Sequence, residues 1–261
     1  MHNRTLGKDG PQVSAIGFGA MSFCDFYGPT TEIESHAILD AALELGITHL
    51  DTSNVYGMGK SENAIGSFLA DRGSAMRDRF SIATKASITS DRNTGRRVYD
   101  NSRAHLTQEL EASLKRLKTD VIDLYQFHWP NRGSYMFRQN WEFDPSSQNK
   151  ADTIANMEEC LGALQREVDR GTIRAFGLSN ESAWGTAQWL AAAERVGGPR
   201  VASVQNEYSL MCRVYDTDMG ELSFHEGVTL LAFSPLATGL LTGKYSSGAV
   251  PEGSRQTLSP G

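Results

Sequence analysis

The sequence has few cysteines and no long apolar run. Its three cysteines, Cys24, Cys160 and Cys212, lie far apart and form no Cys-x-x-Cys pair. They therefore indicate neither a disulfide framework nor a zinc site. No stretch of about 18 apolar residues is present, which argues against a membrane-spanning helix, and the first residues contain no apolar signal-peptide core. These absences predict a protein of the reducing cytoplasm.

The chain also lacks an excess of positive charge. Acidic residues number 31 and basic residues 25, which gives a net charge of −6. A nucleic-acid-binding protein would need a basic stripe or patch, so that class is excluded. With 39% hydrophobic and 21% charged residues, the composition is that of a globular protein. A chain of 261 residues can bury a large core, and we expect one domain over residues 1–261.

Segments typical of strands and helices alternate along the sequence. After a hairpin over Arg4–Ile16, strands are predicted at Ala15–Ala20, Ile47–Thr52, Phe80–Lys85, Val121–His128, Ile173–Leu178, Val201–Asn206 and Val228–Ser234. Helices are predicted at Thr31–Gly46, Ser61–Leu69, Ser102–Leu117, Thr153–Arg170 and Ser182–Val196, with a poorer one near Asp216–His225. The first helix has one apolar stripe, made of Ile33, Ala37, Ile38, Ala41, Ala42 and Leu45.

Strict alternation of strands and helices predicts an α/β fold with parallel strands, either an open doubly wound sheet or a closed barrel. An open dinucleotide-binding sheet would place a G-x-G-x-x-G turn after its first strand. The segment Gly17–Ser22 lacks the third glycine, and the connection that follows is too long for a tight turn. The pattern therefore favours the (β/α) barrel of the triosephosphate isomerase type.

Polar side chains follow three of the predicted strands. Asp51, Lys85 and His128 stand at strand ends, and Tyr56 lies on the loop after the second strand. Chemistry in α/β barrels sits at the carboxyl ends of the strands. Each residue alone also fits an ordinary structural role, such as a helix cap, a rim lysine, a core histidine or a packing tyrosine. Four such residues on one face point instead to an active site.

Several motifs, taken in order, resemble those of the aldo-keto reductases. The resemblance rests on Gly46–Gly57, Ala83–Lys85, Asp123–Pro130, Ile173–Asn180, Gln205–Leu210, Ala232–Leu236 and Gly243–Tyr245. It covers nearly the whole chain. The long segment after the seventh strand is similar to the bacterial oxidoreductase and potassium-channel β-subunit branches. The family's barrel is closed at its base by an N-terminal hairpin, which agrees with the hairpin predicted above.

The resemblance implies that a nicotinamide cofactor, NADP(H) by family habit, reduces an aldehyde or ketone. Tyr56 would be the general acid, and the Lys85 ammonium would lower the tyrosine pKa from about 10. Asp51 would hold Lys85 in place, while His128 would donate a hydrogen bond to the carbonyl oxygen. No metal is implied, and no cluster at ligand spacing suggests one.

The resemblance also implies the cofactor contacts. Ser179, Asn180 and Gln205 match positions that bind the nicotinamide carboxamide, and Phe233 matches the aromatic that stacks on the nicotinamide ring. Small residues after the seventh strand would let backbone N–H groups approach the pyrophosphate. The full set of expected cofactor residues is Met21, Asp51, Ser179, Asn180, Gln205, Phe233, Ser234, Pro235, Leu236, Gly239, Leu240, Lys244 and Arg255.

An aromatic-rich insertion at Asn131–Lys150 predicts a pocket for an apolar carbonyl compound. Its Tyr135, Phe137, Trp141 and Phe143 would be joined there by Met21, Phe23, Phe26, Tyr27 and Trp129. The substrate itself and the oligomeric state stay open. A second class of function is also open, that of a cofactor-binding, redox-sensing regulatory subunit with little turnover.

Seven strands are predicted where a closed barrel needs eight. The chain stops after a Gly/Ser/Pro-rich tail, Tyr245–Gly261, without the last strand and its helices. An unclosed barrel would expose two sheet edges. We therefore expect the sequence to be part of a longer protein, or a partner to cover the gap, and we expect the tail to be mobile without cofactor.

Overall fold

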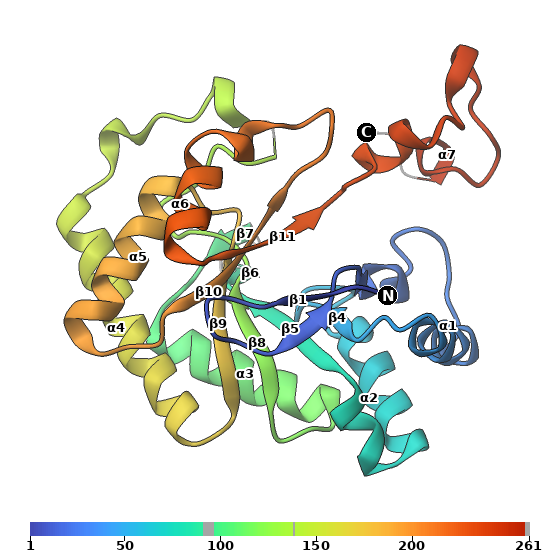
Figure 1. The fold of residues 1–261 in the computed structure, drawn as a ribbon, viewed down its shortest axis with the longest axis horizontal. Coiled ribbons are helices and arrows are strands. Elements are labelled where there is room, and N and C mark those ends of the chain that lie inside the picture. The colour runs from blue at the N-terminus through green and yellow to red at the C-terminus, as the bar shows by residue number, and fades with distance from the viewer. Residues whose placement is uncertain (91–96, 138, 259–261) are drawn as a thin grey trace.

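The protein forms a strongly curled parallel sheet wrapped by helices (Figure 1). The structure, a computed structural model, describes residues 1–90, 97–137 and 139–258. Seven strands pair in the order β11-β10-β9-β8-β5-β4-β3, all of them parallel. They are β3 (Gly17–Gly19), β4 (His49–Asp51), β5 (Ser81–Ala86), β8 (Ile122–Phe127), β9 (Ile173–Ser179), β10 (Val201–Glu207) and β11 (Thr229–Phe233). The predicted α/β barrel class is thereby confirmed.

Helices connect the strands on the outside of the sheet. They are α1 (Glu32–Glu44), α2 (Lys60–Arg72), α3 (Arg103–Leu117), α4 (Lys150–Asp169), α5 (Ala183–Val196) and α6 (Asp218–Glu226), and a short α7 (Arg255–Leu258) follows the last strand. The main core lies between these helices and the sheet, with side chains such as Leu50, Phe68, Leu110, Tyr125 and Phe176 fully buried.

Side-chain caps determine where several helices begin. Thr31 and Glu34 form a reciprocal capping box at the start of α1, and Ser102 and Ser182 accept N–H groups at the starts of α3 and α5. Asn149 caps α4, so this helix begins one turn before the predicted Thr153.

A two-stranded hairpin lies across the base of the sheet. It consists of β1 (Asn3–Thr5) and β2 (Gln12–Ser14), as predicted. Ser14 Oγ accepts hydrogen bonds from the N–H groups of Thr48 and His49 at the start of β4. The Gly7 N–H donates to Thr229 Oγ1, 2.8 Å away, at the start of β11. The hairpin therefore links two strands that lie near opposite edges of the sheet.

The apolar stripe of α1 faces mainly outward, contrary to the pattern of a core-facing helix. Ile33 is 82% exposed and Leu45 is 68% exposed, and Ala37, Ile38 and Ala41 are exposed too. The buried positions of α1 are instead Ser35, His36, Leu39 and Ala42. Helix α1 thus packs on the sheet with a narrow, partly polar face and leaves an apolar stripe without cover among the described residues.

A second small hairpin was not anticipated. β6 (Ile88–Ser90) and β7 (Arg97–Tyr99) pair in antiparallel register after β5. Short 3₁₀ segments occupy several connections, including η1 (Ala20–Cys24) after β3 and η6 (Ala237–Thr242) after β11. These segments lack the apolar periodicity that reveals longer elements.

The sheet has two edges, β3 and β11. Within the described ranges, neither edge pairs with a strand on its outer side. The expected mobility of the tail, Tyr245–Gly261, stays a prediction, and residues 259–261 lie outside the described residues. No helix in the described part of the chain is long and apolar enough to cross a membrane.

Candidate active site

The structure brings the four expected catalytic residues together at the carboxyl ends of neighbouring strands. Asp51 is the last residue of β4, Lys85 lies near the end of β5, and His128 directly follows β8. Tyr56 lies on the loop between β4 and α2. Because these strands are parallel neighbours, their side chains meet on one face.

Lys85 is the centre of the group and is fully buried. Its Nζ donates to Asp51 Oδ2 at 2.7 Å and to the Thr52 carbonyl oxygen at 2.8 Å. The third donor direction leads to the Tyr56 hydroxyl oxygen, 3.4 Å away. The ammonium is therefore held by a carboxylate and a carbonyl and directed at the tyrosine.

Two glutamines hold the other oxygen of Asp51. Oδ1 accepts from Gln205 Nε2 at 2.9 Å and from Gln126 Nε2 at 3.2 Å. With Lys85 on Oδ2, both carboxylate oxygens are occupied. A buried carboxylate is costly unless its oxygens are paired in this way, so the arrangement keeps Asp51 in one orientation.

His128 packs against Tyr56 edge to face. The two rings have centroids 5.9 Å apart and an interplanar angle of 82°. His128 Nδ1 lies 3.1 Å from Ser53 Oγ, and the His128 carbonyl accepts from Asn180 Nδ2 at 2.9 Å. Ser53 therefore holds the His128 ring at Nδ1, and Asn180 holds the His128 backbone.

Burial sets the charge states of the group. Burial and the charges of Lys85 and Arg97 lower the pKa of His128 well below its usual value, so the imidazole is neutral. Burial would lower the pKa of Lys85, but Asp51 and Tyr56 outweigh it, and the pKa is raised. The lysine is therefore an ammonium at neutral pH.

Burial raises the Tyr56 pKa by more than Lys85 lowers it, so the expected effect of Lys85 is present but the net shift is upward. The pKa therefore stays above 10.0. The proximity to Lys85 was predicted correctly, but the cost of moving a phenolate out of water is larger. Tyr56 is accordingly a protonated phenol at neutral pH.

Two residues of the site were missed in the sequence. Gln126 lies two positions before His128 in β8, and Ser53 follows two positions after Asp51. Alternate residues of a strand face the same side, so the position of His128 could have indicated that Gln126 also points into the barrel. Ser53 had no comparable signal, because it lies on a loop.

The expected carboxamide-binding residues also converge here. Gln205 contacts Asp51 directly, and Ser179 Oγ donates to the Gln205 carbonyl at 2.9 Å. Asn180 has a left-handed backbone, with φ at 55°. Its side-chain Oδ1 is buried without a hydrogen-bond partner. A buried acceptor left open in a constrained residue fits the N–H group of a carboxamide, so these residues suit a nicotinamide.

The chain after β11 forms the next part of the expected cofactor site. Ser234, Ala237, Thr238 and Gly239 all have positive φ, between 49° and 100°. Successive N–H groups in such turns form concave surfaces that suit anions. The expected pyrophosphate contacts Ser234, Pro235, Leu236, Gly239, Leu240 and Lys244 lie on or next to this loop.

Arg255 and Met21 meet at Tyr27. Arg255 Nη1 donates to the Tyr27 hydroxyl at 2.8 Å, and its guanidinium lies over the Tyr27 and Phe26 rings. The Tyr27 hydroxyl points to Met21 Sδ at 4.0 Å. The first connection of the sheet and the C-terminal segment are thus in contact, and the cofactor role of both residues stays a prediction.

Four aromatic rings stack in a row beside the site. Tyr99 stacks on Trp129 (5.3 Å between centroids), Trp129 on Phe137 (5.5 Å) and Phe137 on Phe233 (5.3 Å). Phe137 is 56% exposed and has φ at 54°. One face of Phe233 is therefore covered by Phe137, so a nicotinamide ring would use the other face or displace Phe137.

Other members of the expected pocket contribute unequally. Tyr135 and Phe143 are in edge contact, with centroids 6.0 Å apart. Trp141 is 91% exposed and Phe23 is buried in the core, so neither lines the pocket as predicted.

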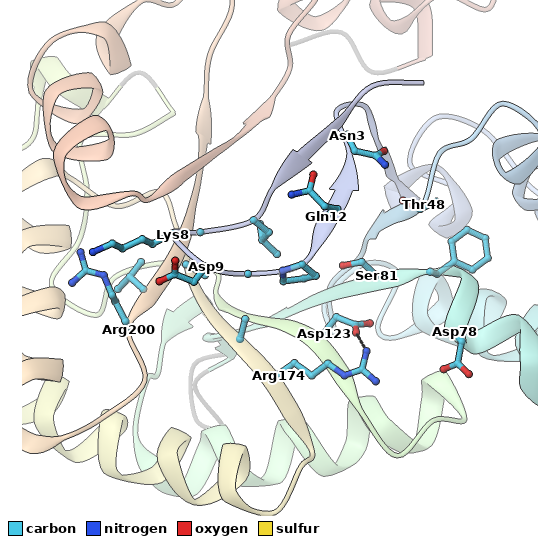
Figure 2. A pocket seen from close by; sticks show the side chains of 18 of the residues that line it. Asn3, Lys8, Asp9, Gln12, Thr48, Asp78, Ser81, Asp123, Arg174 and Arg200 are labelled. Carbon is cyan, nitrogen blue, oxygen red and sulfur yellow. Dashed lines mark hydrogen bonds and ion pairs between the residues drawn. The ribbon is translucent and has the colours of Figure 1, made fainter.

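Two further features lie away from the four catalytic residues. One is a cavity of about 620 Å³. Figure 2 shows the side chains that line it, among them Lys8 and Asp9 of the hairpin and Asp123, Arg174 and Arg200. Its lining includes the amino ends of several strands, so it lies at the base of the sheet.

A group of possible metal ligands, which was not expected, lies between α1 and α2. It consists of Glu32, His36 and Asp71. His36 Nε2 is 3.8 Å from Glu32 and Nδ1 is 3.5 Å from Asp71. The imidazole ring therefore lies between two carboxylates, and each ring nitrogen faces a different one.

Comparisons with known proteins show the family of this chain. The model of the Aldo/keto reductase family matches residues 15–258. The chain therefore belongs to the aldo/keto reductase family, whose members are oxidoreductases that use a nicotinamide cofactor.

Individual relatives span the same region. Protein tas of Escherichia coli is 37% identical over 260 residues, which are 95% of this chain and 71% of that protein. The Aldo-keto reductase yakc [NADP(+)] of Schizosaccharomyces pombe is 33% identical, over 98% of this chain and 68% of its own length. The solved structure of aldo-keto reductase AKR11C1 from Bacillus halodurans (holo form) superposes with a TM-score of 0.70 at 29% identity, over 97% of this chain and 71% of that one.

Proposed function

We propose that this protein reduces an aldehyde or ketone with NADPH and that Tyr56 is the general acid. The observation that carries the proposal is the contact of the Lys85 ammonium with both Asp51 and the Tyr56 hydroxyl, 2.7 and 3.4 Å away. His128, neutral and in contact with the same ring, supplies a second polar group.

A bound dihydronicotinamide supplies a hydride to the carbonyl carbon. The chain's task is to stabilise the negative charge that develops on the carbonyl oxygen and to protonate it. Tyr56 gives its phenol proton to that oxygen, and Lys85 stabilises the phenolate that remains. His128 donates a hydrogen bond to the same oxygen and orients the substrate. The proton returns to Tyr56 from solvent after the alcohol leaves.

The cofactor would be held by Ser179, Asn180 and Gln205 at its carboxamide and by the loop after β11 at its pyrophosphate. The open Oδ1 of Asn180 supports the first part, and the run of positive φ angles supports the second. The preference for NADP(H) is supported by the similarity to the Aldo-keto reductase yakc [NADP(+)] of Schizosaccharomyces pombe.

The row of stacked rings favours a flat, apolar carbonyl compound. Trp129 immediately follows His128, and its ring is one of the four. Offset stacking on such rings adds about 0.5–1.5 kcal/mol per contact beyond the burial of area. Small polar aldehydes should therefore be poorer substrates than aromatic ones.

A regulatory role is the second candidate. It is favoured by the similarity to a probable voltage-gated potassium channel subunit beta of Arabidopsis thaliana, 31% identical over 99% of this chain. In that case the protein would bind the cofactor and turn it over very slowly.

Loss of NADPH absorbance with a panel of aromatic and aliphatic aldehydes distinguishes the two candidates. Tyr56→Phe keeps the ring and removes the proton. We expect turnover to fall by at least about a hundredfold, the scale of lost acid catalysis, with cofactor affinity nearly unchanged. Turnover close to that of the wild type in this variant would exclude Tyr56 as the acid.

A further inference from the structure

A cluster of charged side chains lies behind the loop that carries Tyr56. This loop runs from Thr52 to Gly59, between β4 and α2. Its inner side faces Lys85, as described above. Its outer side faces α3, which contributes Glu109 and Arg116.

The first half of the loop is anchored by Asn54. Its backbone N–H donates to the Lys85 carbonyl at 3.2 Å, and its side-chain Nδ2 donates to Glu109 Oε2 at 2.7 Å. Asn54 is buried, so the short bond to Glu109 defines how this part of the loop meets α3.

The second half is anchored through Glu62, in the first turn of α2. Glu62 is fully buried and accepts from Thr84 Oγ1 at 2.6 Å and from Arg116 Nε at 2.5 Å. Gly59 has φ at 90°, and a Cβ there would lie 2.5 Å from Arg116 Cδ. The stem of Arg116 is thus packed directly against the end of the loop.

Arg116 connects the two anchors. Besides its bond to Glu62, its Nη2 lies 3.9 Å from Glu109 Oε2 and 3.2 Å from Ser113 Oγ. One guanidinium therefore lies within ion-pair distance of two carboxylates, Glu62 near one end of the Tyr56 loop and Glu109 near the other. The fork of an arginine can do this, whereas the point charge of a lysine cannot hold both.

We propose that Arg116 is a positioning residue for Tyr56, holding the loop against α3 through Glu62 at one end and through Glu109 and Asn54 at the other. It contacts no reacting atom. The expected effect on the rate rests on the proposed function, in which Tyr56 is the general acid. Displacing a catalytic group by about 1 Å lowers the reaction rate on the order of a hundredfold.

The test compares Arg116→Met with a matched variant, Arg72→Met. Arg72 is the last residue of α2, at the opposite end of that helix from the loop. It binds Asp40 of α1 at 2.6 Å and lies over the Phe68 ring. We expect R116M to lower kcat by about 10- to 100-fold, with cofactor affinity and KM nearly unchanged, and R72M to leave kcat as in the wild type. Arg116→Lys should fall between wild type and R116M.

A double variant separates the loss of loop positioning from the cost of leaving the Glu62 carboxylate buried without a cation. R116M leaves that carboxylate buried without its cation and can unfold for this reason alone. Arg116→Met with Glu62→Gln removes the unpaired charge and should restore folding, but not kcat. Recovery of wild-type kcat in the double variant, or loss of kcat in R72M equal to that in R116M, would overturn the proposal.

A spectroscopic measurement keeps the inference separate from the proposed function. With ¹³C-labelled tyrosine, the Tyr56 ring signal is assigned as the one missing in Y56F. We expect it to shift or broaden in R116M and in the double variant, and to stay unchanged in R72M. An unchanged signal refutes the positioning role whether or not the protein reduces carbonyls, whereas a shifted signal in a protein without reductase activity refutes only the proposed function.

Discussion

Removing the Lys85 charge tests the centre of the site. The Lys85 Nζ is fully buried and makes its two short bonds to Asp51 and the Thr52 carbonyl. In Lys85→Met the Asp51 carboxylate keeps the two glutamines but loses its cation. Breaking a buried ion pair by removing one partner typically costs about 3–5 kcal/mol, because a charge remains without compensation. We expect a loss of this size in the free energy of unfolding, measured by urea denaturation.

A second variant shows whether the unpaired charge is the cause. Asp51→Asn combined with Lys85→Met leaves no net charge in the site, and we expect it to recover at least about 2 kcal/mol of the loss. Turnover should stay low in both variants, because neither has a cation to stabilise the phenolate. The matched control is Lys60→Met, which removes an exposed lysine paired with Asp25 and should change unfolding little.

The outcomes that contradict this reasoning are specific. If K85M unfolds at the same urea concentration as the wild type, Asp51 is not held by Lys85 as the structure has it. If the double variant is no more stable than K85M, the loss comes from packing rather than from the orphaned carboxylate.

Three further predictions follow from burial in the site. Burial, and after it the charges of Lys85 and Arg97, lowers the pKa of His128. The neutral imidazole therefore contributes to the free energy of unfolding above about pH 6.5, and this contribution is lost as the pH falls. In His128→Gln the free energy of unfolding, measured in urea, should decrease less steeply as the pH is lowered. The pKa of Tyr56 is raised, so the rate of carbonyl reduction should be level through neutral pH and fall only as the pH rises through a value above 10.0, and a pH–rate profile falling near neutrality would contradict this. Asn180→Ala removes the open acceptor and should weaken NADPH binding by about tenfold, the scale of one hydrogen bond, in a fluorescence titration; unchanged affinity would place the carboxamide elsewhere.

The grouping of the four residues proposed as catalytic could be predicted because each occupies a position with a structural meaning. Asp51, Lys85 and His128 end parallel strands, and parallel strands end on one face. Tyr56 follows one of these ends at a short distance. The family motifs then gave the roles. The prediction depended on the order of strands and helices and on which residues end the strands, and both can be derived from the alternating pattern of the sequence.

Contacts between distant segments could not be predicted in the same way. In the sequence, Glu62 stands in the first turn of a predicted helix, a position where an acidic residue commonly favours the helix dipole. The structure shows instead that it is fully buried and bound to Arg116, 54 positions along the chain. The direction that the apolar stripe of α1 faces could not be predicted for a related reason. Periodicity identifies an amphipathic helix but not the element that packs against its apolar face.

The Tyr56 pKa shows why burial decides the chemistry of this site. The sequence identifies the partner, Lys85, and the partner alone would lower the pKa. Desolvation acts in the opposite direction and is larger, and it could be known only from the packed structure. Its consequence is functional, because at neutral pH the phenol is protonated, the lysine is charged and the imidazole is neutral. In the proposed mechanism Tyr56 gives a proton to the carbonyl oxygen, so reduction uses the protonated phenol, whereas oxidation of an alcohol would use the phenolate. A raised Tyr56 pKa therefore agrees with the proposed carbonyl reduction at neutral pH.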